Sequence, residues 1–147
     1  MIERTCVLVK PDGVRKNLIG TVIARFEKEG LVLAGLRMMP PDSGFIEQFY
    51  GEHKGKPFYE ALVQFMTSGP IVACVWEGDN AISRVRAING ATDSKKAEPG
   101  TLRNLYGTDG RMNLVHASDS AASAKREISL IFKETDLTAP QPISAVV

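Results

Sequence analysis

The order of apolar and polar positions predicts four strands along the chain. Each is a short run of apolar or β-branched residues without helical spacing, at residues 5–10, 31–38, 71–76 and 112–116. The run at 31–38 is apolar at both alternating sets of positions, which is typical of a central strand covered on two faces.

Apolar residues that recur every three or four positions predict helices between and after these strands. Pro57 is expected to open one helix, and the Asp79 side chain is expected to cap the next. The expected helices cover residues 18–30, 45–50, 57–69, 79–90 and 121–132.

Two segments lack any such period. Residues 91–111 are polar and glycine-rich, which predicts a long loop, and long loops in compact domains are usually functional or disordered. The tail, 138–147, contains two prolines and is expected to be loosely held. Since no repeat or linker is present, we expect one domain over residues 1–147. Taken alone, the alternation of strands and helices favours a doubly wound parallel sheet.

Composition and charge exclude several function classes. The 147 residues carry a net charge of +1, so neither nucleic acid nor a membrane surface is an expected partner. No apolar run approaches the roughly 20 residues of a spanning helix, and residues 1–13 lack a signal-peptide pattern. Cys6 and Cys74 lie inside apolar runs and are expected to be buried, reduced thiols. We therefore expect a cytoplasmic protein.

His116 is the residue on which the chemistry depends. It stands between an apolar run and the sequence A-S-D-S, which begins a predicted helix whose N-terminus can attract an anion. Glu127 lies two turns into that helix and could orient the imidazole. A neutral imidazole is a competent nucleophile near neutral pH. The pattern therefore indicates a general base or a phosphoryl acceptor, although a histidine that only hydrogen-bonds its neighbours is also compatible with it.

Basic and hydroxyl side chains stand at positions that could surround a phosphoryl group. Each also has an ordinary explanation, such as a strand-end charge or a solvated helix residue. The generic phosphate-binding motifs GxxxxGK[ST] and GxGxxG are absent, and the cysteines lack zinc-site spacing. The candidates are Lys10, Tyr50, Arg86, Thr92 and Arg103.

Four segments in order resemble the nucleoside diphosphate kinase family, and the resemblance covers about residues 3–137. The octapeptide N-L-V-H-A-S-D-S is similar to the family's active-site signature, and V-K-P-D-G-V to its first-strand lysine motif. K-P-F-Y-E-A-L-V-Q-F-M-T-S-G-P-I-V-A-C-V-W-E-G resembles the segment that leads from the nucleotide-binding phenylalanine into the third strand. A-T-D-S-K-K-A-E-P-G-T-L-R resembles the nucleotide loop.

The resemblance implies transfer of the terminal phosphate of a nucleoside triphosphate to a nucleoside diphosphate. The implied route is ping-pong through phosphohistidine, with Mg²⁺ carried by the nucleotide phosphates and no metal ligand in the protein. His116 would carry the phosphoryl group, supported by Ser118 and Glu127. The implied nucleotide contacts are Lys10 and Tyr50 to the transferring phosphate or sugar hydroxyl, Asn113 to the sugar, Arg86, Thr92 and Arg103 to the outer phosphates, and Phe58 to the base with Leu62 beside it.

The resemblance also implies a different fold from the one that the pattern favours. The family has an α+β, ferredoxin-like βαββαβ core, in which helices cover a four-stranded antiparallel sheet. It further implies a homo-oligomer, either a tetramer or a hexamer.

The sequence departs from the family pattern at two places. Asn104, Leu105 and Tyr106 stand where the family often has Gly-Asp-Phe, and Asp93-Ser94 stands where many members have Asn-Pro. The alternative functions are a catalytically silent nucleotide-binding domain and a histidine phosphocarrier that serves a protein. The complete set of candidate residues argues against the first, and Phe58 with the loop cations argues against the second.

Overall fold

The computed structural model describes residues 1–138, and these form a four-stranded sheet with helices on both faces. The strands are β1 (Ile2–Val9), β2 (Val32–Met39), β3 (Ile71–Asp79) and β4 (Val115–Ala117), in the spatial order β2-β3-β1-β4. Every pairing is antiparallel. The antiparallel sheet implied by the resemblance is therefore confirmed, and the parallel sheet favoured by the pattern is wrong.

The wrong expectation has a physical reason. β3 is buried along nearly its whole length because helices cover both faces of the sheet. An antiparallel strand covered on both faces has the same continuous apolar sequence as a parallel one, so the pattern cannot separate the two arrangements.

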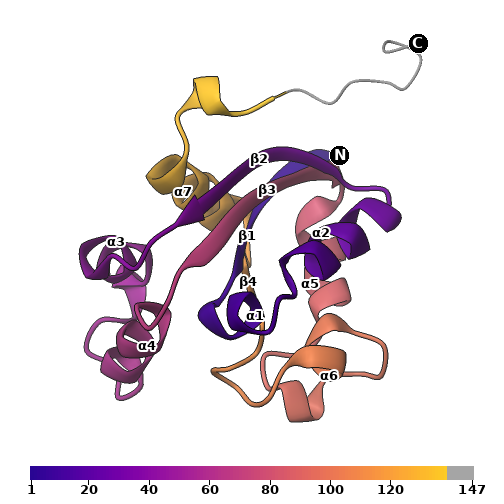
Figure 1. Cartoon of the computed structure of the whole chain (residues 1–147). Coiled ribbons are helices and arrows are strands. Elements are labelled where there is room, and N and C mark those ends of the chain that lie inside the picture. The colour runs from indigo at the N-terminus through magenta and orange to yellow at the C-terminus, as the bar shows by residue number, and fades with distance from the viewer. Residues whose placement is uncertain (139–147) are drawn as a thin grey trace.

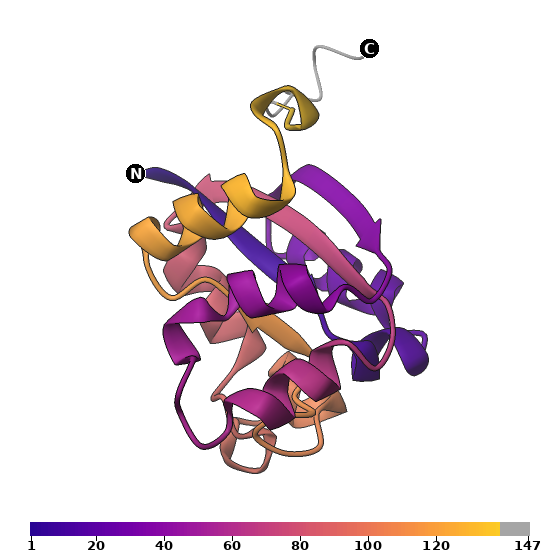
Figure 2. The same ribbon diagram turned by 90° about the vertical axis from the view of Figure 1, so that its left-hand side faces the viewer.

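The helices form two groups (Figure 1). On one face lie α1 (Pro11–Arg15), α2 (Ile19–Lys28), α5 (Ala81–Asn89) and α6 (Leu102–Tyr106). On the other lie α3 (Ser43–Phe49), α4 (Tyr59–Met66) and α7 (Ala121–Ile131), which stand in front of the sheet in Figure 2. The short 3₁₀ turns are η1 (Gly51–His53), η2 (Ser94–Lys96) and η3 (Glu134–Asp136).

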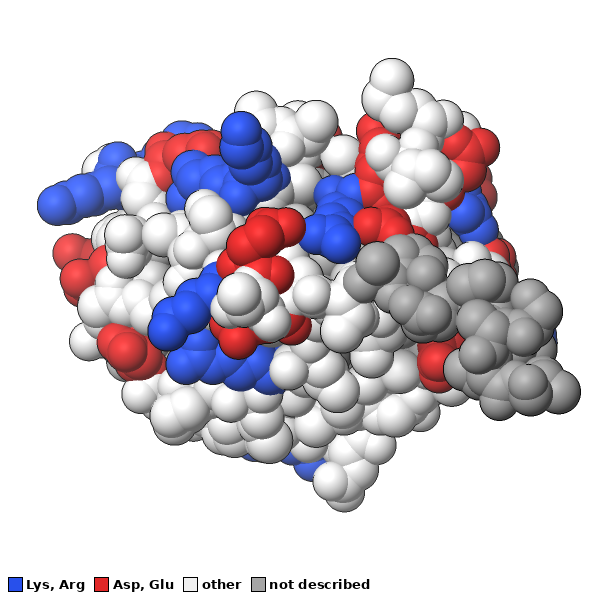
Figure 3. Space-filling model, turned by 90° about the horizontal axis from the view of Figure 1, so that it is seen from above, with Lys and Arg blue, Asp and Glu red and all other residues white. Residues whose placement is uncertain are grey.

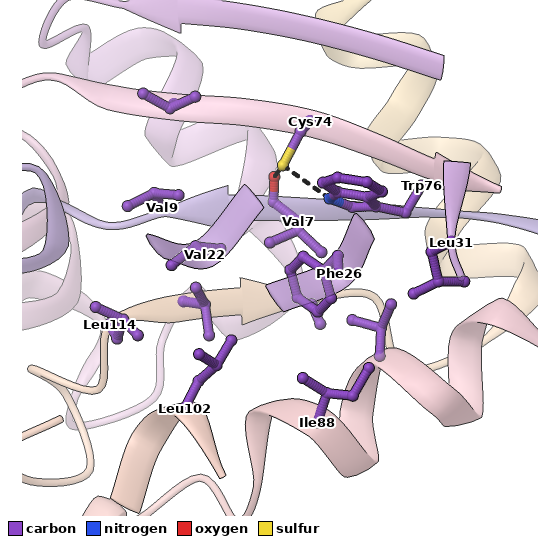
Figure 4. Close-up of a cluster of buried hydrophobic side chains, with 14 of the residues drawn as sticks. Val7, Val9, Val22, Phe26, Leu31, Cys74, Trp76, Ile88, Leu102 and Leu114 are labelled. Carbon is purple, nitrogen blue, oxygen red and sulfur yellow. Dashed lines mark hydrogen bonds between the residues drawn. The ribbon is translucent and has the colours of Figure 1, made fainter. Parts of the chain in front are cut away.

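Each face of the sheet has its own apolar core. Beneath α2 and α5, the rings of Phe26 and Trp76 lie 5.2 Å apart at their centroids. The Trp76 indole N–H donates to the Cys74 sulfur, which lies between it and the Val7 carbonyl (Figure 4). Beneath α3, α4 and α7 the core contains Ile46, Phe49, Met66 and Ile131, among others. Cys6 and Cys74 are buried and free, as predicted.

The segment predicted as a loop, 91–111, contains the turn η2 and the helix α6. The Thr101 hydroxyl accepts a hydrogen bond from the Asn104 N–H and so caps α6. A helix of five residues is too short to show an apolar period, so this expectation was wrong.

Several predicted boundaries also differ. β4 begins at Val115 and not at residue 112, and β1 ends at Val9, so Lys10 stands just before α1. α4 begins two residues after Pro57. Asp79 is the last residue of β3 and binds the amino group of Met1, so it does not cap α5. A periodic pattern locates an apolar face better than it locates the residue at which a helix begins.

Thr138, the last described residue, donates its N–H to the Ala34 carbonyl at 2.9 Å. The rest of the predicted loose tail lies outside the described residues. On the face seen in Figure 3, acidic and basic groups are interspersed among uncharged residues. Within residues 1–138, no helix combines the length and apolarity needed to cross a bilayer.

Candidate active site

A cavity of about 660 Å³ opens between β4, the α3–α4 hairpin and the segment that contains α6. α4 and α6 lie on opposite sides of the lower end of the sheet in Figure 1. Among the predicted site residues only Ser118, which is fully buried, does not line this cavity. Those that do are Lys10, Tyr50, Phe58, Leu62, Arg86, Thr92, Arg103, Asn113, His116 and Glu127.

The backbone before His116 has an unusual conformation that sets where the histidine stands. Leu114 has a φ of 76°, in the left-handed region that a leucine rarely adopts. Its N–H donates to the Asp12 carboxylate at 3.0 Å, and its carbonyl accepts from the Lys10 N–H at 2.9 Å. These bonds stabilise the turn, so His116 enters β4 opposite Leu8 of β1.

The imidazole of His116 is held from two directions. Its Nε2 lies 3.0 Å from Oε1 of Glu127, and 19% of the side chain is exposed. The ring of Phe49 packs edge-on against it at 5.0 Å, and that of Tyr50 at 5.7 Å. The ring orientation is therefore fixed while one edge remains accessible.

Glu127 is brought to His116 by the helix that follows it. Ser120 caps α7 by accepting the Ser123 N–H, and Glu127 lies on the buried side of this helix with 5% of its surface exposed. The Ser118 hydroxyl donates to the same Oε1 at 2.7 Å and accepts the Cys6 N–H at 3.2 Å. The carboxylate oxygen beside the imidazole thus has a second, fixed donor.

Lys10 and Asn113 form a buried pair at the floor of the cavity. The Lys10 ammonium donates to Oδ1 of Asn113 at 2.7 Å and to the Arg111 carbonyl at 3.1 Å. The Asn113 amide donates to the carbonyls of Thr92 and Gly110. Burial, with a smaller contribution from the nearby Arg103 charge, lowers the pKa of Lys10 to about 8. Lys10 is therefore still a cation at neutral pH.

The two arginines are held differently. The Arg103 guanidinium is buried and donates to the carbonyls of Asn113, Gly90 and Val115. Burial and the neighbouring Arg86 lower the pKa of Arg103 to about 10. Arg86 is exposed, and the one hydrogen bond that its guanidinium makes within residues 1–138 is a long one, 3.5 Å to the Ala117 carbonyl. Arg103 braces the strand that carries His116, whereas Arg86 is free to move toward a ligand.

The opposite wall is aromatic and more exposed. The Phe58 side chain is 44% exposed, and the Lys56 ammonium lies 5.8 Å from its ring centre. Leu62 lines the cavity on the same hairpin. The Tyr50 hydroxyl is buried with no hydrogen-bond partner among the described residues. Burial, with the Glu127 charge, raises the pKa of Tyr50, so it remains a neutral phenol.

His53, Asp119 and Arg126 are among the cavity residues that were not singled out from the sequence. The His53 ring lies 5.4 Å from Phe58 and 6.2 Å from Tyr50. Asp119 and Arg126 also line the cavity. The one available signal for Arg126 was that it directly precedes Glu127 in the chain. His53 had no such signal, because only the folded hairpin brings it into the site.

The described residues do not build a metal centre of their own. Within residues 1–138, no group of three or more histidine, cysteine, aspartate or glutamate side chains is placed to hold a metal ion. The cavity instead gathers lysine and arginine side chains, which suit the oxygens of phosphate groups. This set of residues suits a ligand that carries phosphate groups.

Comparisons with known proteins place this geometry in a family. The model of the family described as nucleoside diphosphate kinase matches residues 3–137. A nucleoside diphosphate kinase of Carboxydothermus hydrogenoformans is 54% identical over 136 residues, with 92% of this chain and 91% of that protein covered. One from Sulfurisphaera tokodaii is 53% identical over 139 residues, with 95% of each chain covered.

Solved structures agree with the sequence comparisons. The nucleoside diphosphate kinase of Halobacterium salinarum in complex with CDP matches with a TM-score of 0.94 and 43% identity, covering 99% of this chain and 97% of that one. The Aquifex aeolicus enzyme matches with a TM-score of 0.91 and 42% identity, covering 94% and 100%. The chain therefore belongs to the nucleoside diphosphate kinase family.

Proposed function

We propose that this nucleoside diphosphate kinase works by a ping-pong route in which His116 carries the phosphoryl group. Its Nδ1 attacks the terminal phosphorus of a nucleoside triphosphate, the bond from that phosphorus to the bridging oxygen breaks, and the diphosphate leaves. A terminal oxygen of a second nucleoside diphosphate then attacks the phosphorus and releases the imidazole. The observation that carries the proposal is a fixed imidazole facing a cavity lined by cations.

The contact with Glu127 indicates which nitrogen reacts. Nε2 lies at hydrogen-bond distance from a carboxylate oxygen, so the proton belongs on Nε2 and the lone pair on Nδ1. Nδ1 has no hydrogen-bond partner among the described residues. Positive charge that develops on the ring during attack is balanced by Glu127, which supports roles for Glu127 and Ser118 in orienting the histidine.

The lysine and arginine side chains of the cavity are suited to stabilising a phosphoryl group during transfer. Charge in this transition state is spread over the equatorial phosphate oxygens, and fixed donors stabilise it most. We assign Lys10 to the transferring phosphate and Arg86, Arg103 and Thr92 to the outer phosphates. Arg103 already donates to three carbonyls, so its contribution is chiefly the charge that it brings to the cavity.

The remaining contacts concern the nucleoside and the phosphate oxygens. The exposed Phe58 ring offers a face for stacking a base, with Leu62 beside it, and stacking tolerates every base because each has an aromatic face. The Tyr50 hydroxyl, which lacks a partner, is assigned to the transferring phosphate or the sugar. Asn113 already binds Lys10, so we assign it to both the sugar and the placement of that ammonium.

The substrates enter as Mg²⁺ complexes. A Mg²⁺ ion bound to the nucleotide would neutralise part of the phosphate charge, and the lysine and arginine side chains that line the cavity suit the remaining phosphate oxygens. We also propose a reducing, cytoplasmic location, because both cysteines are buried free thiols.

A homo-oligomer is supported by the edge of the sheet. β2 is an edge strand, and Val32, Leu36 and Met38 on it are 40%, 52% and 57% exposed. An apolar edge strand is a surface on which a second copy can pair. Leu36→Lys with Met38→Lys should lower the mass measured by light scattering, whereas unchanged mass would place the interface elsewhere.

The histidine assignment is tested by replacing the nucleophile. His116→Ala should abolish transfer from a triphosphate to a diphosphate, since among the described residues no other imidazole is paired with a carboxylate as His116 is with Glu127. A chase of labelled protein with nucleoside diphosphate should remove the label from the parent. Label that is retained in the chase would favour the alternative phosphocarrier, and a failure to label would favour the silent binding domain.

A further inference from the structure

Arg126 lies on α7 directly before Glu127 and has none of the nucleotide contacts proposed above. One of its terminal nitrogens, Nη2, donates to the Phe49 carbonyl at 3.1 Å and lies 4.0 Å from Oε2 of Glu127. Its Nε is buried and lies 3.5 Å from the Glu52 carboxylate. The guanidinium thus sits at the junction of α7 and the hairpin.

Glu127 depends on a nearby cation. Its Oε1 faces His116 and Ser118, and its ion pairs within residues 1–138 are with His116 and Arg126 alone. Glu127 is 5% exposed, and a charge withdrawn from water is costly unless an opposite charge or hydrogen-bond donors stabilise it. Arg126 supplies that charge on the side opposite the imidazole.

Nη2 of Arg126 also holds Phe49, the other neighbour of His116. Phe49 ends α3, and its ring packs edge-on against the imidazole at 5.0 Å. By binding the Phe49 carbonyl, Arg126 ties the packing of this ring to the helix that carries Glu127. One guanidinium therefore restrains both the acidic and the aromatic contact of the nucleophile.

We infer that Arg126 is a positioning residue for the phosphoryl acceptor, which aims Glu127 at Nε2 of His116 and holds Phe49 against the ring. The inference rests on the proposed role of His116. Arg126 acts through Glu127 and Phe49 and does not itself bind the nucleotide.

Other charged and titratable groups around Glu127 do not take the place of Arg126. Cys6 of β1 and Tyr50 face the carboxylate, but burial raises the pKa of both, so both stay neutral near pH 7. Arg86 and Arg103 bind the carbonyls of Ala117 and Val115, on either side of the histidine. An arginine side chain is charged near neutral pH, so Arg126 provides a positive charge beside Glu127 there.

Removal of the Arg126 charge should shift the pH dependence of the rate in a predictable direction. Without Arg126, Glu127 accepts a proton more readily, and while it is ionised it favours the protonated imidazole more strongly. Either change removes the reactive pair at low pH. The acid limb of the rate profile should therefore move to higher pH.

The test compares Arg126→Met with the parent and with Lys125→Met, which removes an exposed charge from the neighbouring position. In Arg126→Met, labelling of His116 by nucleoside triphosphate in a single turnover should slow about tenfold at pH 7, the scale of a lost charged hydrogen bond. The acid limb should shift upward and the nucleotide dissociation constant should stay within about twofold. Arg126→Lys should recover part of the rate, and Lys125→Met should match the parent.

A second readout needs no nucleotide. In NMR titrations of the free protein, the His116 ring signals of Arg126→Met should change at higher pH than those of the parent. If the variant showed this shift but nucleoside triphosphate did not label the parent, the proposed function would be refuted and the positioning role of Arg126 would stand. Weaker nucleotide binding with an unmoved pH profile would overturn the inference, as would a Glu52→Gln variant that reproduced the whole loss.

Discussion

The two walls of the cavity differ in how firmly their side chains are held. The β4 wall is dense with hydrogen bonds and ion pairs, and most of its polar groups are buried. The hairpin wall has few directional contacts, and its outermost ring, that of Phe58, is 44% exposed. The β4 wall comprises Lys10, Arg103, Asn113, His116 and Glu127, and the hairpin wall comprises Tyr50, His53, Phe58 and Leu62.

This difference matches two different demands. A transferring phosphate is the same in every turnover, so fixed charges can be aimed at one place before the substrate arrives. Bases differ between nucleotides, and a ring face accepts any of them without a specific hydrogen bond. The comparison predicts that changes in the β4 wall lower the rate of transfer, and that changes at Phe58 or Leu62 weaken nucleotide binding.

The largest effect should come from the charge at the floor of the β4 wall. Lys10→Met removes the ammonium that Asn113 positions, and transfer should fall by about 100- to 1000-fold with a smaller change in KM. Lys16→Met, which loses an exposed lysine contact to the Tyr106 carbonyl, is the matched control. Steady-state kinetics measures both variants. A Lys10→Met enzyme with a near-parental kcat would contradict the role of the β4 wall in setting the rate.

A smaller loss is expected at Glu127. Glu127→Ala removes the carboxylate that orients His116, a contact worth about 1–3 kcal/mol, so the labelling rate should fall by about 5- to 150-fold while the chain stays folded. Glu134→Ala changes an exposed carboxylate and should have no effect on the rate. Equal rates in Glu127→Ala and parent would mean that the carboxylate has no part in catalysis.

The hairpin wall should respond in affinity. Phe58→Ala should raise KM about tenfold for every nucleotide, with kcat within about threefold of the parent, because a stacked base contributes about 1–3 kcal/mol. Leu105→Ala, at an exposed apolar side chain that does not line the cavity, provides the control. Kinetics with purine and pyrimidine substrates measures both constants. A lower kcat with an unchanged KM in Phe58→Ala would contradict the stacking role of Phe58.

The last prediction concerns stability and its dependence on pH. Because the pKa of Lys10 is lowered from about 10.5 to about 8, the unfolded chain binds more protons than the folded one between these values. The free energy of unfolding of the parent, relative to Lys10→Met, should therefore rise from pH 8 to pH 10. Transfer activity should fall over the same range as the ammonium is lost. Chemical denaturation at several pH values measures the first trend, and a difference that is flat or falling would show that Lys10 is not held as a buried cation.

The sequence predicts the two walls unequally. Lys10 and His116 stand beside a recognisable turn and a strand end, so local signals singled them out, whereas Asn113 was assigned only through the resemblance. The resemblance to a known family supplied the antiparallel sheet, which periodicity could not, because strands covered on both faces look alike in either arrangement. Helix α6 was missed since five residues show no period, and His53 and Arg126 were missed because only tertiary packing brings them to the cavity.

The central claim is that the Nδ1 atom of His116 accepts the phosphate. Incubation of the parent with a triphosphate labelled in its terminal phosphate, with no acceptor present, tests it most directly. The account predicts an acid-labile, base-stable label, located on His116 by mass spectrometry and at Nδ1 by NMR, that a nucleoside diphosphate removes. An acid-stable label, or a label that survives in His116→Ala, would contradict the account.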